Sequence, residues 1–291
     1  MTDTRLKPEY YVRTILASLV HQGGIMPTNK TVLGLVGSPN KAGRTNELVL
    51  AALSGAQNAG ANTELIQMSD HVVLACKDCL PWVCATNLKC TYPDEGFETL
   101  SKKISDAGAL IVGSPVYWGD TSAMVRYLFI KMCRVFARSG QLKGLPAFGI
   151  AIAGGSGNGM MTGLKPIYHF FRVMQMRPLD PVPATRFDFD QAKAKARAQG
   201  EGIAKMVETR APFTSQEECW LAYDRLPYIG ENRAGERRLL AAITTEAVPG
   251  DRKKEIDGDL AKADILAASG ASLDALSEVT TVYNSALKLL S

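Results

Sequence analysis

The sequence predicts an α/β fold, in which a doubly wound, five-stranded parallel sheet carries N- and C-terminal helical extensions. Short apolar runs of strand length alternate with longer segments of helical periodicity from residue 31 to about residue 210. Two of these runs, 31–36 and 109–112, lead into the same tripeptide, Gly-Ser-Pro. We therefore expect an N-terminal helical extension (1–30), a sheet domain (31–210) and a mostly helical C-terminal extension (211–291).

The first predicted strand is followed by a loop that favours an anion. Residues 31–36 are apolar and rich in β-branched side chains, and a helical pattern covers 47–59. Backbone N–H groups at the start of that helix, together with its dipole, would attract negative charge. The loop does not fit the Walker pattern, because the Gly37–Gly43 spacing is one residue too long, and Ser38 breaks the dinucleotide fingerprint.

The side chains of this loop suit the dianionic end of a mononucleotide. They offer hydroxyls at Ser38 and Thr45, an amide at Asn46 and cations at Lys41 and Arg44, and Pro39 is expected to belong to the same site. On the loop alone, an ordinary connection between a strand and a helix remains the alternative.

Two further loops are predicted at the same edge of the sheet. The strand 109–112 leads into Gly-Ser-Pro-Val-Tyr-Trp-Gly, in which Tyr117 and Trp118 offer flat faces to an aromatic ring. The strand 146–153 leads into Gly-Gly-Ser-Gly-Asn-Gly, where missing side chains would let the backbone approach a flat ring. A flexible turn is the alternative for this third loop. Carboxyl ends of parallel strands converge at the crevice where such sheets bind ligands.

The remaining elements complete an order of 2-1-3-4-5. We expect a second strand at 62–68, and helices at 97–107, after Thr121 or Ser122, at 164–174 and at 190–207. A fifth strand between 176 and 183 contains three prolines, which predicts an edge position. His169, in the helix expected at 164–174, should be a packed or surface group. Cys133, in the helix expected after Thr121 or Ser122, should be a buried hydrophobe.

Three segments make the chain resemble the flavodoxin-like NADPH-dependent FMN reductases, including the branch called iron–sulfur flavoproteins. They are GSPNKAGRTN (37–46), GSPVYWGDTSAMVRYLFIK (113–131) and LKGLPAFGIAIAGGSGNG (142–159), and the resemblance covers about residues 31–208. It implies non-covalent FMN, with NAD(P)H as the electron donor. The loop at 37–46 would then hold the phosphate, and the ring would be framed by Ser114, Pro115, Val116, Tyr117, Trp118, Gly119, Ala153, Gly154, Gly155 and Ser156.

A long cysteine-rich connection (70–96) follows the second strand. Its length indicates a function, and it holds Cys76, Cys79, Cys84 and Cys90. The resemblance implies that these four thiolates ligate a [4Fe–4S] cluster, although four residues separate Cys79 from Cys84 where the family usually has two. A structural zinc ion or unliganded thiols remain alternatives.

Composition excludes several classes of protein. The net charge of +4 is small and no Lys/Arg tract occurs, so nucleic acid is not an expected partner. No apolar run reaches membrane-spanning length, and the N-terminus does not resemble a signal peptide, so we expect a cytoplasmic protein with reduced thiols.

Helical patterns also occupy both extensions. We expect a helix over 8–20 and an amphipathic helix over 272–290 with Leu273, Leu276, Val279, Tyr283 and Leu287 facing inward. The extensions would provide oligomer contacts or a cover over the flavin. A homodimer or homotetramer is expected, with FMN near the subunit interface.

Three functions are compatible with this sequence. The first is an FMN-dependent oxidoreductase that passes electrons from NAD(P)H to a small-molecule or protein acceptor. The second is an electron carrier without its own substrate, and the third is a flavodoxin-like domain used in assembly. We expect no catalytic side chain, because no nucleophile motif or acid–base pair is visible and flavin chemistry needs none.

Overall fold

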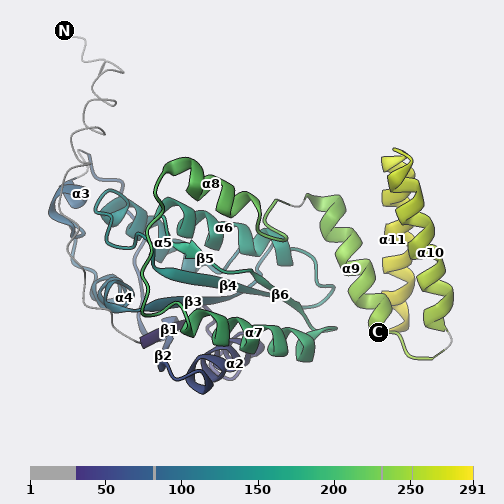
Figure 1. The fold of residues 1–291 in the computed structure, drawn as a ribbon, viewed down its shortest axis with the longest axis horizontal. Coiled ribbons are helices and arrows are strands. Elements are labelled where there is room, and N and C mark those ends of the chain that lie inside the picture. Colours follow the sequence, from purple (N-terminus) through teal and green to yellow (C-terminus); the bar gives the residue numbers. More distant parts are fainter. Residues whose placement is uncertain (1–30, 81–82, 231, 251, 291) are drawn as a thin grey trace, which may run out of the picture.

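The computed structural model describes residues 31–80, 83–230, 232–250 and 252–290 (Figure 1). The helix expected at 8–20 lies outside the described residues. The elements that the structure does describe form a three-layer α/β domain with a helical bundle at one end of it.

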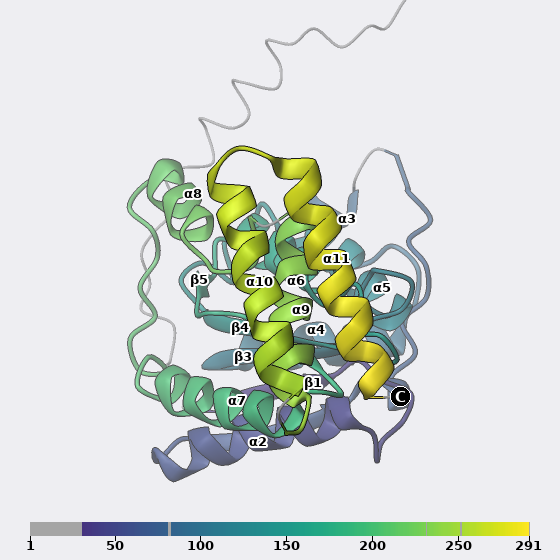
Figure 2. The same cartoon turned by 90° about the vertical axis from the view of Figure 1, so that its right-hand side faces the viewer.

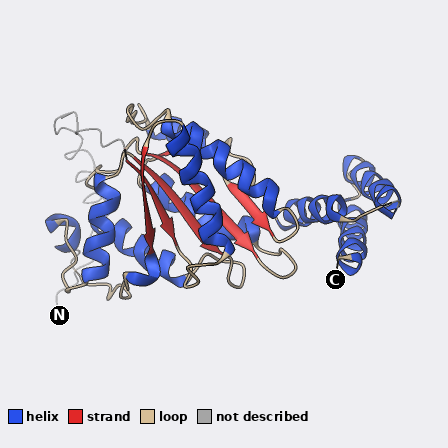
Figure 3. Cartoon of the chain, turned by 90° about the horizontal axis from the view of Figure 1, so that it is seen from below, coloured by secondary structure: helices blue, strands red, loops and turns tan. Residues whose placement is uncertain are grey.

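The sheet confirms the flavodoxin-like order 2-1-3-4-5, and its strands point in one direction (Figure 3). Its strands are β1 (Thr31–Val36), β2 (Asn62–Gln67), β3 (Ala109–Pro115), β4 (Pro146–Ala153), β5 (Arg177–Pro178) and β6 (Val182–Thr185). All paired neighbours are parallel. The expected fifth strand is divided into β5 and β6, which both pair with β4 at the sheet edge. Proline lacks the N–H that a continuous ladder needs, so the interruption is tolerated at an edge.

Helices cover both faces of the sheet (Figure 1). On one face lie α2 (Arg44–Asn58) and α7 (Phe189–Ala204), and on the other α4 (Glu95–Asp106), α5 (Ala123–Phe136) and α6 (Met160–Val173). Alternate residues of β1 enter the two cores: Val32 faces α2, whereas Leu33 faces the opposite layer. Both faces are therefore buried, which explains why the strands are continuously apolar.

Glycines bring α2 and α7 unusually close together. A Cβ atom on Gly200 would lie 1.8 Å from the carbonyl oxygen of Ala52, and one on Gly55 would lie 2.0 Å from that of Arg197. Only glycine fits at these two positions, so Gly55 and Gly200 allow the backbones of the two helices to touch.

The connection after β2 has little regular structure. It contains the 3-10 helix η1 (Met68–Asp70) and the short helix α3 (Val83–Asn87), and it ends where Asp94 caps α4 by accepting a hydrogen bond from the Phe97 N–H. Five residues are too few for a helix that is stable by itself. Its position therefore depends on contacts with α5, against which α3 packs.

Among the described residues, four helices follow the sheet domain. The first, α8 (Gln216–Asp224), buries Cys219 and Tyr223 in the core beside α6. The other three, α9 (Arg233–Ala247), α10 (Arg252–Ala268) and α11 (Ser272–Leu289), form a bundle at one end of the molecule (Figure 2). This bundle has its own core, which also contains Ala153, Met160 and Met161 of the sheet domain.

The inward face expected for the last helix is partly wrong. Leu273 is 79% exposed, whereas the buried positions of α11 are Ala275, Val279, Val282, Tyr283 and Ala286. The bundle packs small alanines inward, and the pattern of large side chains alone did not indicate this. No helix in the described parts of the chain is long and apolar enough to cross a bilayer.

Candidate functional site

The first glycine-containing loop leaves β1 and enters α2 at the carboxyl edge of the sheet. The Ser38 hydroxyl accepts a hydrogen bond from the Asn40 N–H (3.2 Å), and the Asn40 side chain accepts one from the Ala42 N–H (3.1 Å). These short-range bonds fix the loop without a ligand. Gly37 donates to the carbonyl of Gly113 (2.8 Å), which connects this loop to the end of β3.

The start of α2 is available to an anion. Gly43 occupies the N-cap position and offers no side-chain hydrogen bond, so the first N–H groups of the helix have no side-chain cap. Thr45 is buried beneath this turn at 3% exposure, and Arg44 is exposed, with its guanidinium 5.6 Å from the Phe189 ring. The arrangement suits a phosphate at this helix end.

The other predicted side chains of this loop have different surroundings. Lys41 forms an exposed ion pair with Asp70 (2.5 Å), and Pro39 is exposed. The Asn46 side-chain oxygen accepts a hydrogen bond from Gln67 of β2 (2.6 Å). Lys41 and Asn46 therefore already have protein partners, whereas Arg44 and Thr45 lie at the uncapped turn.

Ser114 organises the second loop from inside. Its buried hydroxyl accepts hydrogen bonds from the Thr121 hydroxyl (2.8 Å) and the Ser122 N–H (2.9 Å), and it donates to the carbonyl of Pro115 (2.9 Å). Ser122 is the N-cap of α5, as expected, but its hydroxyl makes no cap bond and has no protein partner. This unpartnered oxygen lies 3.3 Å from the position of a Cβ on Gly37, so it faces the first loop.

The tip of the second loop is a strained two-residue turn. Tyr117 and Asp120 exchange backbone hydrogen bonds of 2.8 and 3.1 Å, and between them Trp118 (φ +54°) and Gly119 (φ +78°) are both left-handed. Glycine adopts this conformation freely, but a bulky residue does so rarely. Trp118 is also fully exposed and Tyr117 about half exposed. The turn therefore presents two aromatic side chains at a cost in backbone strain, which is typical of a functional segment.

The third loop follows β4 and has an open side. Gly154 and Gly155 are exposed, and a Cβ atom on either would meet no other atom within 4 Å. Gly157 lies on the closed side, where a Cβ would be 2.8 Å from Leu240 of α9. Ala153 is buried and Ser156 is partly buried. The open side leaves room for a flat group.

All three loops lie together at one edge of the sheet. The Val116 N–H donates to the carbonyl of Ile152 (2.9 Å), and Val116 packs closely against Gly159 and Gly163. The first loop meets the second through Gly37 and Gly113. This edge is also the point where the strand order reverses between β1 and β3, the usual location of ligands in such sheets.

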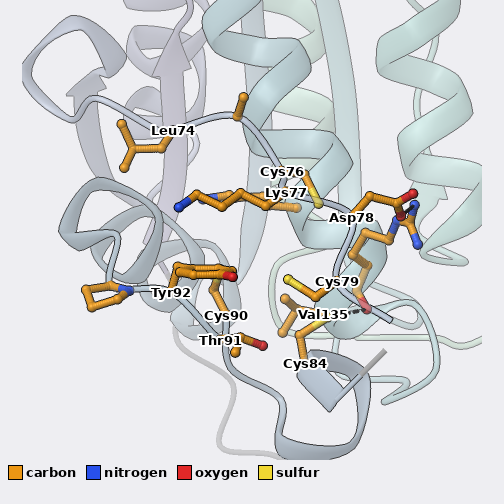
Figure 4. Close-up of a pocket in the computed structure, with 14 residues that line it drawn as sticks. Leu74, Cys76, Lys77, Asp78, Cys79, Cys84, Cys90, Thr91, Tyr92 and Val135 are labelled. Atoms are coloured by element: carbon orange, nitrogen blue, oxygen red, sulfur yellow. Dashed lines mark hydrogen bonds and ion pairs between the residues drawn. The ribbon is translucent and has the colours of Figure 1, made fainter. Parts of the chain in front are cut away.

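The four cysteines of the long connection line one cavity of about 160 Å3 (Figure 4). They are partly exposed free thiols, and Cys84 and Cys90 also pack against the adjacent core. Cys133 of α5 does not line this cavity, and burial raises the pKa of its thiol to about 11.

Cations of α5 border the same cavity. Lys131 is 4% exposed and pairs with the buried carboxylate of Asp94, while Arg134 pairs with Asp78. Asp94 also accepts hydrogen bonds from the N–H groups of Leu74 and Phe97, each 3.0 Å long. Burial alone would raise the pKa of Asp94, but the bonds from Lys131 and the two N–H groups outweigh it and lower the pKa. Asp94 thus anchors both ends of the connection.

The four cysteines are suitable ligands for an iron–sulfur cluster, but their thiols are not positioned to hold one in this structure. Four thiols line one cavity, and four Cys thiolates are the ligand set of a [4Fe–4S] cluster. Nevertheless, no three Cys, His, Asp or Glu side chains in the described part of the chain are close enough together to hold a metal ion. A cluster or zinc ion would therefore have to draw the connection together when it binds.

Several residues at these sites were not expected from the sequence. They are Asp94 and Lys131 at the cysteine cavity, Ser122 beside the first loop, and Glu236 and Tyr283, which contact the third loop region from the C-terminal bundle. Asp94 stands directly before a helical pattern, which indicates an N-cap. The other four have no local sequence feature that indicates their contacts.

Comparison with known proteins agrees with this geometry. Residues 31–186, more than half of the chain, match the model of a family described as NADPH-dependent FMN reductase. An iron–sulfur flavoprotein of Methanocaldococcus jannaschii is 32% identical over 145 residues, which cover 50% of this chain and 73% of the relative. An iron–sulfur flavoprotein of Methanosarcina thermophila is 25% identical over 145 residues, covering 50% and 74%.

The solved structure of a flavone reductase has a similar fold. It matches with a TM-score of 0.50 at 15% identity, and the match covers 62% of this chain and 63% of that one. The family match ends at residue 186, so α7 and the C-terminal helices lie beyond it.

Proposed function

Because the chain belongs to the family of NADPH-dependent FMN reductases and iron–sulfur flavoproteins, and is therefore a flavin oxidoreductase, we propose that it takes electrons from NAD(P)H through FMN and passes them to a small-molecule or protein acceptor. The observation that carries this proposal is the meeting of three loops at the β1/β3 switch point. Bound FMN supplies hydride and single-electron chemistry that side chains do not offer.

The first loop is assigned to the FMN phosphate. The uncapped N–H groups of α2 would donate hydrogen bonds to it, the hydroxyls of Ser38 and Thr45 would add short contacts, and Arg44 would supply positive charge. The unpartnered hydroxyl of Ser122 faces the same loop and would gain a hydrogen-bond partner. This set combines neutral hydrogen-bond donors with the charge of Arg44 and the partial positive charge of the helix end, all of which favour an anion.

The second and third loops are assigned to the flavin ring. Val116, Tyr117 and Trp118 would frame one side of the ring, and the open backbone at Gly154 and Gly155 would approach another edge. The absence of atoms around these glycines leaves the room that a flat ring needs. Tyr117 and Trp118 would also exclude water from the ring.

The cysteine connection is assigned to a [4Fe–4S] cluster held by Cys76, Cys79, Cys84 and Cys90. A cluster there would supply one-electron transfer to a partner. The relatives' names support the proposal, since both compared proteins are iron–sulfur flavoproteins. Cys84 lies in α3, whereas Cys76, Cys79 and Cys90 lie outside it.

The absorbance spectrum of anaerobically purified protein, recorded before and after NADPH, tests the main proposal. We expect a flavin spectrum that NADPH bleaches without a partner protein. Flavin that NADH and NADPH both leave oxidised would instead favour an electron carrier. Protein that neither contains nor binds FMN would contradict the proposal.

We also propose that the protein is a homodimer or homotetramer. Tyr127 and Ile130 are exposed on the outer face of α5, and Trp118 is exposed beside the flavin loops. A second copy that covers these side chains would remove apolar area from water. Light scattering at micromolar concentration should show a dimer or larger, and flavin-loaded monomer alone would contradict this.

A further inference from the structure

The C-terminal bundle contacts the third loop directly, although the family match does not extend to it. The buried hydroxyl of Tyr283 on α11 donates a hydrogen bond to the backbone carbonyl of Ser156 (2.6 Å). Leu240 on α9 fills the space beside Gly157, whose φ is +81°. Two helices that are far from the loop in sequence therefore hold its closed side.

The same bundle also holds the helix that follows the loop. Glu236 of α9 is 8% exposed, and its carboxylate accepts a hydrogen bond from the N–H of Met161 (2.9 Å) in the first turn of α6. Its negative charge lies at the positive end of that helix, which is a favourable position. Gly159, the N-cap of α6, offers no side-chain bond of its own. The bundle thus supplies the cap that α6 lacks.

This loop needs external support because of its composition. Gly155, Gly157 and Gly159 all have positive φ values, of +50°, +81° and +89°. Glycines lose more conformational entropy on ordering than other residues, so a loop with so many is costly to hold in one conformation. Within the loop, one backbone bond, from Gly157 to Gly154 (2.8 Å), and one between the Asn158 and Ser156 side chains (2.8 Å) are present.

We propose that the C-terminal bundle serves as a built-in rear support of the flavin site, with Tyr283 and Glu236 as positioning residues for the loop at 154–159. The inference rests on the proposed function, since it takes the open side of that loop as the place of the flavin ring. The bundle holds the closed side, and the open side at Gly154 and Gly155 stays accessible. FMN then binds a loop that is already ordered, and it does not lose affinity in ordering it.

The test compares two Tyr→Phe variants of the full chain. Tyr283→Phe removes the hydrogen bond to Ser156. Tyr223→Phe is the matched control, because its hydroxyl is also buried and also donates to a backbone carbonyl, that of Met176 (2.9 Å), away from the loop. We expect Tyr283→Phe to raise the Kd for FMN about fivefold, the factor that corresponds to one hydrogen bond, and to change the visible circular dichroism of bound flavin. Tyr223→Phe should change neither.

A second pair of variants tests Glu236. Glu236→Ala removes the cap of α6, whereas Glu236→Gln keeps an oxygen that can accept from Met161. We expect Glu236→Ala to weaken FMN binding and Glu236→Gln to restore most of the affinity. Equal FMN affinity in wild type, Tyr283→Phe and Glu236→Ala would overturn the proposal.

Hydrogen exchange of the flavin-free protein separates this inference from the proposed function. Amides of residues 154–159 should exchange faster in Tyr283→Phe than in wild type or Tyr223→Phe. Unchanged exchange would overturn the supporting role of the bundle whether or not FMN binds. Faster exchange in Tyr283→Phe, found together with a wild type that binds no FMN, would support the role of the bundle in ordering the loop. It would contradict the proposed function and the assignment of the loop to flavin.

Discussion

The flavin edge and the cysteine connection are two sites of one chain that are built in different ways. At the flavin edge, three loops leave adjacent parallel strands, and backbone hydrogen bonds join them to one another. In the cysteine connection, four thiols lie along a segment whose helices are η1 and the five-residue α3. Strand register therefore places the first site, whereas no regular element in the described part of the connection places the four thiols relative to one another.

This difference indicates how each site responds to its ligand. The flavin edge already has its loops in contact, so FMN would bind a formed site. The thiols share a cavity, but no three ligand side chains converge among the described residues. A metal group would have to organise them, so we expect metal binding and local folding to be coupled there.

The largest effect is expected from removing a cysteine of the connection. Cys84→Ser should lose most bound iron and acid-labile sulfide, because a cluster that organises its own site needs each ligand. Cys133→Ser, which alters a half-buried thiol outside the cavity, is the control and should keep both. The measurement is iron and sulfide analysis of protein purified without oxygen. Iron that is absent even from wild type would indicate a flavin reductase without a cluster.

The next effect concerns the anchor of the connection. Lys131→Met leaves the Asp94 carboxylate buried without its cation, and this should lower the free energy of unfolding by about 3–5 kcal/mol. Adding Asp94→Asn should recover part of that loss, since no charge then remains buried. Urea denaturation measures both, with exposed Lys195→Met as the control. A loss under about 1 kcal/mol would show that the pair is not what holds the connection.

At the flavin edge, the double variant Arg44→Ala/Thr45→Ala should weaken FMN binding by about 2–4 kcal/mol, because two charge-assisted contacts to phosphate are lost. Fluorescence titration with FMN measures the change. Arg197→Ala, in which an exposed side chain of α7 is truncated, removes the same charge elsewhere and should leave the affinity unchanged. Unchanged affinity in the double variant would falsify the phosphate assignment.

A smaller, pH-dependent effect is expected from Asp94. Its pKa in the folded protein lies below the ordinary value of 3.8, so the unfolded chain binds this proton more readily. The stability that it contributes is complete above that ordinary value and is lost as the pH falls through the folded pKa. Denaturation of wild type and Asp94→Asn at several pH values should show a stability difference that decreases only below about pH 4. A constant difference down to pH 3 would contradict this.

The smallest effect is expected at the tip of the second loop. Trp118→Gly should raise the stability of the flavin-free protein by about 0.5–1 kcal/mol, because glycine adopts φ +54° without strain and the exposed indole buries nothing. The same change should weaken FMN binding if Trp118 frames the ring. Thermal unfolding and FMN titration measure the two effects, and Trp220→Gly, in α8, serves as a comparison at a partly exposed tryptophan. An FMN affinity that is unchanged or higher in Trp118→Gly would argue against a framing role.

The sequence anticipated the sheet because its pattern is local. A continuous apolar run such as 109–112 predicts a strand that is buried on both faces. Turn-forming residues, such as those after Val36, predict where a strand ends. The order of the strands followed from alternating helices and from the preference for right-handed crossovers. Division of the edge strand was not anticipated, although its prolines predicted the edge position itself.

Local sequence patterns do not predict contacts between segments that are distant in the chain. The Ser114 hydroxyl accepts hydrogen bonds from Thr121 and Ser122, and no local pattern indicated these contacts. The inward face of α11 depends on which side chains α9 and α10 present to it, and for this reason Leu273 is exposed although a helical pattern placed it inside.

The sequence by itself therefore determined the α/β fold, the three loops at one edge and the four cysteines in one connection. Spacing and periodicity suffice for these features, because neighbours in sequence decide whether a strand, a turn or a helix forms. Only the tertiary structure decided that Lys131 pairs with Asp94 beside the thiols and that Tyr283 reaches Ser156, 127 residues away. Such contacts arise when packed elements bring separate side chains within hydrogen-bond distance, and no local pattern encodes that distance.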